Sequence, residues 1–155
     1  EQARLPRLAA RTLRLEARMC LYGNDLDDAT TPLEAGLGWV VKPDAGDFIG
    51  REALLRQKAT GIPRKLVGLV MEGRGIARHG YAITSPDGAA LGTVTSGTVG
   101  PTVGKNIALG YVPTAHATAG TRVVVDCRGK PVPATIVDGP FYKRPLPTAK
   151  GQQTP

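Results

Sequence analysis

The sequence is poor in the residues that build redox and metal sites. It has two cysteines in 155 residues, Cys20 and Cys127, which form no CxxC pair and have no histidine beside them. This spacing excludes the common zinc and dithiol motifs and favours a reduced, intracellular compartment, for which we expect the cytoplasm. We expect each cysteine to be a small apolar core residue. His79 and His116 stand alone, so no metal site is predicted.

Long apolar runs are also missing. No stretch approaches the roughly 18 residues of a membrane span, and the first residues lack the apolar segment of a signal peptide. We therefore expect no membrane partner. The chain starts at Glu1, without Met, in sequence of helical character. This start leads us to expect the later part of a longer protein.

Aromatic residues make up only 5% of the chain, whereas it has 20 glycines and 13 prolines, a balance typical of short strands and many turns. The net charge of +7 favours an acidic partner, either nucleic acid, a polyglutamate tail or an acidic protein. No aromatic residues alternate with the basic ones to stack on bases, and no nucleic-acid motif is present. We therefore expect no nucleic-acid partner.

The chain changes character near residue 63. Before it, apolar residues at i, i+4 steps predict a helix over residues 5–22 that ends at 23–25. A stripe opposite the apolar face, either a solvated surface or a contact for an anion, is formed by Arg4, Arg7, Arg11, Arg14 and Arg18. Residues 31–41 predict a loop that runs into a short strand. A second helix is predicted over residues 50–59, capped by Asp47 or Gly50.

After residue 63, short β-branched runs alternate with turn residues about every ten positions, a rhythm typical of a small barrel or sandwich. Pro131 and Pro133 predict that the last strand lies at a sheet edge. We expect a disordered tail over 145–155. The predicted strands cover residues 65–72, 81–84, 89–96, 106–112, 121–128 and 131–137.

Local motifs for catalysis are weak. The run from Gly100 to Asn106 resembles a phosphate loop but is one residue short and lacks its Ser or Thr, so we interpret it as a glycine-rich connection between strands. The serines and carboxylates form no recognisable triad or acid pair. Trp39, the only tryptophan, is either a core residue or a stacking wall for a flat heterocycle. The small residues Gly36 and Gly38 just before it would let such a ligand approach the backbone.

Several collinear sequence blocks run from about Ala10 to Arg144, and one of them reads Asp-Phe-Ile-Gly-Arg-Glu-Ala-Leu over residues 47–54. Another reads Gly-Thr-Val-Thr-Ser-Gly over residues 92–97 and precedes Asn-Ile-Ala-Leu-Gly-Tyr-Val. The other blocks are residues 13–17, 21–27, 31–34 with Trp39, 65–69 and 140–144. Together these blocks resemble the C-terminal part of the aminomethyltransferase of the glycine cleavage system, its T-protein.

The resemblance implies an α+β chain, in which a helix-containing remnant of the folate-binding part (1–62) precedes a small antiparallel β-barrel-like C-terminal domain (63–144). It also implies the activity: the aminomethyl carbon passes from the lipoylated H-protein to tetrahydrofolate, with release of ammonia. The family's catalytic carboxylate comes from the N-terminal region. We therefore expect no catalytic residue in this chain, and a fragment that is inactive alone.

The resemblance implies two folate-binding residues. Trp39 matches the tryptophan that lines the family's folate site, and Arg11 matches the arginine that precedes the Leu-Arg-Leu-Glu block. The family has glycine where this chain has Arg18. Alternatives are the folate-binding end of a dimethylglycine or sarcosine dehydrogenase-like enzyme and a non-enzymatic basic β-module. A folate-binding protein of iron–sulfur cluster maintenance is disfavoured, because its Lys-Gly-Cys-Tyr-x-Gly-Gln-Glu signature is missing from residues 47–52.

Overall fold

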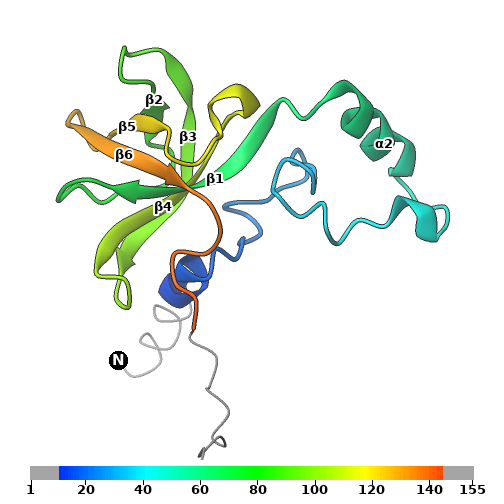
Figure 1. The fold of residues 1–155 in the computed structure, drawn as a ribbon, viewed down its shortest axis with the longest axis horizontal. Helices are drawn as coiled ribbons and strands as arrows, with labels where there is room; N and C mark the ends of the chain where they lie inside the picture. Colours follow the sequence, from blue (N-terminus) through cyan, green and yellow to red (C-terminus); the bar gives the residue numbers. More distant parts are fainter. Residues whose placement is uncertain (1–10, 145–155) are drawn as a thin grey trace, which may run out of the picture.

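The computed structural model describes residues 11–144, and its main feature is a closed antiparallel barrel of six strands (Figure 1). Around the barrel the strand order is β1-β4-β3-β2-β5-β6, and β6 pairs with β1. The expected α+β class with a small antiparallel barrel is confirmed. The strands are β1 (Arg64–Met71), β2 (Ala82–Thr84), β3 (Ala90–Gly100), β4 (Lys105–Pro113), β5 (Arg122–Asp126) and β6 (Pro131–Val137).

The barrel interior is filled by the alternate residues of its strands. In β1, Val67, Leu69 and Met71 point inward and join a buried aliphatic cluster. The outward residues of the same strand, Leu66 and Val70, belong to a second cluster outside the barrel. Because both faces of β1 are covered from Leu66 onward, its sequence is apolar without interruption from Leu66 to Met71.

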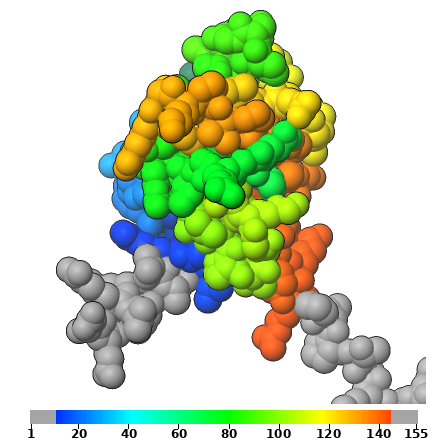
Figure 2. All heavy atoms as spheres, turned by 90° about the vertical axis from the view of Figure 1, so that its left-hand side faces the viewer, coloured from blue at the N-terminus to red at the C-terminus, as the bar shows by residue number. Residues whose placement is uncertain are grey.

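The second cluster attaches the N-terminal segment to the barrel wall. Leu15, which is 2% exposed, packs on Ile107, Leu109 and Tyr111 of the outer face of β4. The residues that follow β6 return to the same place, where the Tyr142 amide donates to the Glu16 carbonyl at 3.0 Å. Figure 1 shows these two segments together below the barrel, and Figure 2 shows them at the lower end of the molecule, on either side of the yellow-green β3–β4 region. The site described below lies beside this junction.

The first helix is shorter than its sequence pattern predicted. Of the described residues in the predicted helix, only 11–16 are helical, and Arg18 already has the left-handed φ of 57°. The predicted end at residues 23–25 is therefore wrong. The predicted arginine stripe is wrong for Arg14 and Arg18 too, because both turn toward the barrel and bind acceptors there. The start of the predicted helix and the tail 145–155 lie outside the described residues.

The segment between the first helix and β1 forms an arm that extends away from the barrel (Figure 1). Residues 31–41 fold as consecutive turns, so the strand predicted there is wrong. Two helices follow: a 3₁₀ turn, η1 (Pro43–Ala45), and α2 (Arg51–Thr60). The helix α2 begins after Gly50 at φ 90° and has no side-chain cap; its predicted position is confirmed, whereas the Asp47 cap is wrong. Another 3₁₀ turn, η2 (Thr114–His116), follows β4.

Two prolines lie in a strand that is paired on both sides, so the predicted edge position is wrong. Cys127 and Lys130 exchange backbone hydrogen bonds at the β5–β6 turn, and the positions of β6 that bond to β5 recur at every second residue from there. Pro131 and Pro133 fall between them. The missing N–H groups of both prolines would therefore face β1. However, β1 ends at Met71 and pairs with β6 only over residues 134–137, beyond both prolines. Barrel closure therefore needs no donor from either proline.

Candidate functional site

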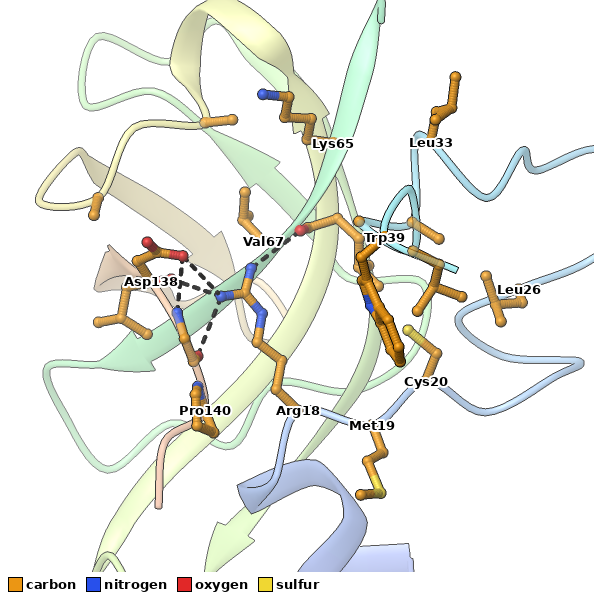
Figure 3. A pocket seen from close by; sticks show the side chains of 18 of the residues that line it. Arg18, Met19, Cys20, Leu26, Leu33, Trp39, Lys65, Val67, Asp138 and Pro140 are labelled. Carbon is orange, nitrogen blue, oxygen red and sulfur yellow. Dashed lines mark hydrogen bonds and ion pairs between the residues drawn. The ribbon is translucent and has the colours of Figure 1, made fainter. Parts of the chain in front are cut away.

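A cavity of about 900 Å³ lies where the N-terminal segment, the arm and one end of the barrel meet. Four parts of the chain supply most of its wall: residues 17–20, residues 33–39, the start of β1, and the loop after β6. Figure 3 shows side chains from these parts around a shared space. Because the wall is made of distant segments, the cavity exists only in the folded chain.

Trp39 stands at this cavity and is 72% exposed, so the core interpretation of this residue is wrong. It lies in the turn-rich segment that the glycines allow: Gly36 has a φ of 74°, and a Cβ at Gly38 would come within 3.2 Å of Leu33. An exposed indole beside a cavity offers a flat apolar face to a ligand. Met19, which is 62% exposed, and Cys20 belong to the same wall.

Arg18 is the most strongly held cation of the cavity. Its Nη1 donates to the carbonyls of Val137 and Gly139 at 3.3 and 3.2 Å, and its Nη2 donates to the Leu66 carbonyl at 3.2 Å. Asp138 lies 3.7 Å away and its side chain is 94% exposed. Burial lowers the pKa of Arg18 from its ordinary value, and the Asp138 charge opposes that shift. In Figure 3 the guanidinium points toward Asp138, away from the indole.

Lys65 is the other cation of this cavity. It lies at the start of β1, is exposed, and has no salt bridge or hydrogen bond from its ammonium group to any described residue. An unpaired ammonium group at the rim of an apolar cavity can hold the acidic part of a ligand. The two cations therefore differ: the Nη groups of Arg18 are used within the protein, while the Lys65 ammonium is available.

Arg11 lines a different, smaller hollow of about 250 Å³, so the structure does not bring it into the cavity of Trp39. The hollow is polar, with Arg78, His79 and Ser96 also in its wall. His79 is fixed there through its Nδ1, 2.9 Å from the Thr95 carbonyl.

A buried network lies beside the smaller hollow, whose wall includes Arg14, Leu21 and Thr95, and the sequence did not reveal it. The carboxylate of Asp25, 1% exposed, accepts hydrogen bonds from Arg14 at 2.8 Å, the Leu21 amide at 2.9 Å and Thr95 at 2.5 Å. Tyr111 donates to the Asp25 carbonyl at 2.8 Å, and its burial raises its pKa to about 12. The signal was present only as Asn-Asp turn chemistry, because Thr95 is 70 residues away.

The glycine-rich run is a β3–β4 turn, as predicted, and its amides already have an acceptor. Glu16, 2% exposed, receives the amides of Thr102 and Val103 at 2.7 and 3.2 Å. This carboxylate occupies the place that a bound anion would take in a phosphate loop. The turn therefore joins the N-terminal segment to the barrel.

The two cysteines are free and partly buried, each packed at the margin of an apolar cluster. Burial raises the pKa of both thiols; the charge of Asp25 adds to the shift at Cys20, and that of Asp126 adds to it at Cys127. The described part of the chain contains no group of three or more His, Cys, Asp or Glu side chains that would suit a metal ion. Across residues 11–144, no helix has the length and apolar character needed to cross a membrane.

Comparison with known families gives two matches that follow one another along the chain. The family described as "Glycine cleavage T-protein C-terminal barrel domain" matches residues 64–143, and "GCVT N-terminal domain" matches residues 6–45. The first match covers the six-stranded barrel. The second covers the segment that carries Trp39 and Arg18.

Curated relatives agree with these matches. An aminomethyltransferase of Nostoc sp. (strain PCC 7120) is 59% identical over 133 residues, which cover 85% of this chain and 35% of the relative. One from Bacteroides thetaiotaomicron is 51% identical over 133 residues, 85% of this chain and 37% of the relative. The chain thus spans little more than a third of the length of the relatives it matches.

A solved structure gives the same result in three dimensions. The glycine cleavage system aminomethyltransferase T of Bartonella henselae superimposes with a TM-score of 0.82 at 38% identity, over 86% of this chain and 38% of that one. At this identity the likeness extends beyond the fold. The closed barrel, the sequence relatives and the two consecutive family matches agree, and this chain belongs to the glycine cleavage T-protein family.

Proposed function

We propose that this chain supplies part of the folate site of a cytoplasmic aminomethyltransferase of glycine catabolism. In the proposed reaction, the aminomethyl carbon carried by lipoylated H-protein passes to tetrahydrofolate, and ammonia is released. One observation carries the proposal: the single tryptophan is exposed at a cavity of about 900 Å³ in a chain of the T-protein family. Under this proposal residues 1–62 belong to the folate-binding part and residues 63–144 form the C-terminal barrel domain.

The chemistry of the cavity suits such a ligand. A reduced pterin is flat and can stack on the Trp39 indole, while the glutamyl carboxylates can reach the free ammonium of Lys65. The aliphatic wall excludes water from the apolar side of the ring. For Arg11 the proposal rests on the family resemblance alone, because this residue lines the separate polar hollow.

The transfer step places demands that this cavity meets only in part. A cationic iminium develops on the reacting carbon and nitrogen, and a buried carboxylate stabilises such charge. Asp138 is the acidic residue in the cavity wall, but its side chain is 94% exposed and faces Arg18. We therefore assign no catalytic residue here and expect the 155-residue chain by itself to show no aminomethyl transfer.

Ligand binding by the chain tests the proposal. We expect tetrahydrofolate to quench Trp39 emission, and isothermal titration to give weaker binding for Trp39→Ala and Lys65→Ala. Lys130→Ala is the matched control, because this lysine is exposed on the β5–β6 turn. An unchanged emission and no heat at millimolar tetrahydrofolate would remove Trp39 from the site. Equal affinities for the Lys65 and Lys130 variants would remove Lys65.

A further inference from the structure

The strands β1 and β6 separate beside the cavity, and Arg18 lies at the point where they do. Their register runs from Met71–Ala134 to Gly68–Val137 and stops there. Continued by two residues, the same register would pair Leu66 with Gly139. Instead, the carbonyls of both residues accept hydrogen bonds from the Arg18 guanidinium, each at 3.2 Å. One side chain thus takes the place of the next rung of the ladder.

We propose that Arg18 is a positioning residue that holds β1 and the loop 137–140 apart at a fixed separation, and so sets the width of the cavity that Trp39 faces. We call this arrangement the Arg18 bridge: Arg18 with the carbonyls of Leu66, Val137 and Gly139. A planar guanidinium can donate to two strands at once, whereas an ammonium group donates from a single point. The bridge also satisfies carbonyls that would otherwise lose their partners where the strands diverge.

The backbone at this position supports the assignment. Arg18 has a φ of 57°, a conformation that glycine adopts readily and that costs other residues free energy. Two backbone hydrogen bonds fix the turn. The Arg18 amide donates to the Leu15 carbonyl at 2.9 Å, and the Met19 amide donates to the Arg14 carbonyl at 2.8 Å. A side chain in an unfavourable conformation is retained where it makes compensating contacts. The bridge provides these contacts.

The contacts at the two ends of the loop 137–140 do not by themselves fix its distance from β1. On one side β6 ends at Val137, and on the other Phe141 packs in the outer cluster while the Tyr142 amide donates to Glu16. Between these anchors, the guanidinium of Arg18 supplies the hydrogen bonds that join the loop to β1. Asp138 contributes little, because its carboxylate is solvated and 3.7 Å distant.

Two substitutions separate the side chain from the backbone. Arg18→Ala removes the bridge and keeps an unfavourable φ, while Arg18→Gly removes the bridge and relieves that φ. Amide hydrogen exchange of Val137 and Tyr142, measured by NMR on the 155-residue chain, reports the loop. We expect exchange to rise about tenfold in both variants, because charge-assisted bonds are lost in both. We also expect Arg18→Gly to melt at a higher temperature than Arg18→Ala.

Arg122→Ala is the control, since Arg122 forms an exposed ion pair with Glu72 on the barrel surface and should leave the loop unchanged. Arg18→Lys tests the planar fork: we expect faster exchange than in the unmodified chain. Exchange that is unchanged or slower in both the Ala and Gly variants would overturn the proposal, as would full protection in Arg18→Lys.

The effect on ligand rests on the proposed function and is measured separately. We expect Arg18→Gly to weaken tetrahydrofolate binding about tenfold with Trp39 intact. If the unmodified chain binds no tetrahydrofolate while the exchange response is seen, the proposed function fails and the bridge stands. If tetrahydrofolate binds equally well to the chain with and without Arg18, the bridge does not set the cavity.

Discussion

At the scale of single residues, three buried carboxylates accept hydrogen bonds that connect distant segments of the chain. Asp25, Glu16 and Glu34 are all less than 8% exposed. Asp25 fixes the N-terminal segment to β3, Glu16 binds the β3–β4 turn, and Glu34 joins the arm to β1. A buried charge is tolerated only when it is paired and hydrogen-bonded. Each of the three therefore specifies one contact between distant segments.

Asp25→Asn removes the charge and keeps the shape. The new amide group faces the Arg14 guanidinium, which would lie next to it without a counter-charge. We expect a loss of about 3 kcal/mol in the free energy of unfolding. Urea denaturation followed by circular dichroism measures it, with the exposed Asp44→Asn as the control. Equal midpoints for the two variants would mean that the network contributes nothing to stability.

The raised thiol pKa of Cys20 has a direct chemical consequence. Burial and the nearby Asp25 charge favour the thiol over the thiolate, so a smaller fraction is reactive at any pH below the midpoint. In a Cys127→Ala background, we expect the iodoacetamide rate of the folded chain to reach half its maximum at a higher pH than that of the unfolded chain. The urea-unfolded chain provides the reference. A folded midpoint at or below that of the unfolded chain would contradict the assigned burial.

Residue roles in the site were only partly predictable from the sequence. The sequence singled out Trp39 as the only tryptophan, but it left open whether this residue lies in the core or lines a ligand site. The role of Arg18 was hidden, since an arginine at helical spacing suggests a solvated stripe, and the helix in fact ends before it. A signal was available in the resemblance, which implies glycine at this position, because glycine readily adopts a positive φ such as the 57° of Arg18. The partners of Asp25 were not predictable, because they lie far apart in the chain.

At the scale of elements, the strands were predictable and their surroundings less so. β-branched runs bounded by turn residues correspond to all six strands within a few positions. The errors arose where tertiary contacts decide. Closure of the barrel pairs β6 on both sides despite Pro131 and Pro133. Residues 31–41 form turns because Glu34 binds Arg64 of the barrel, and this contact outweighs the local β propensity.

Gly92 in β3 tests how closely the strands approach. A Cβ there would lie 2.0 Å from the Tyr111 carbonyl oxygen, which is a backbone atom of the paired strand β4 and cannot rotate away. We expect Gly92→Ala to lower the free energy of unfolding by at least about 2 kcal/mol. Gly73→Ala is the matched control, because its Cβ would meet Val132 at an ordinary 3.6 Å. Similar thermal midpoints in the two variants would show that β3 and β4 can shift apart.

At the scale of the whole molecule, the chain consists of a well-packed barrel and a lightly attached arm. The barrel has a continuous buried interior, whereas α2 buries none of its residues. Figure 1 shows α2 standing away from the strands. The attachment runs through Glu34, which accepts from Gln57 of α2 at 3.0 Å and from Arg64 of β1 at 3.1 Å. Local opening of the arm should therefore need less free energy than unfolding of the barrel.

Glu34→Ala tests this difference. Loss of the carboxylate frees Gln57 and Arg64 together, so amide exchange in α2 should become several-fold faster while exchange of β1 residues such as Leu69 stays the same. Hydrogen–deuterium exchange resolved by peptide measures both regions in one sample. Glu52→Ala, an exposed position of α2, controls for helix propensity. Uniform acceleration over arm and barrel would mean that the two unfold as one unit.

The pairing of the first strand of the barrel with its last has a consequence for synthesis on the ribosome. Until Ala134–Val137 leave the exit tunnel, one side of β1 has no neighbour, and its backbone donors and acceptors remain open to other nascent or misfolded chains. Early termination anywhere before β6 would leave that side permanently unpaired. Such products should be the ones that aggregate or recruit chaperones, whereas chains that reach Val137 can close the ring.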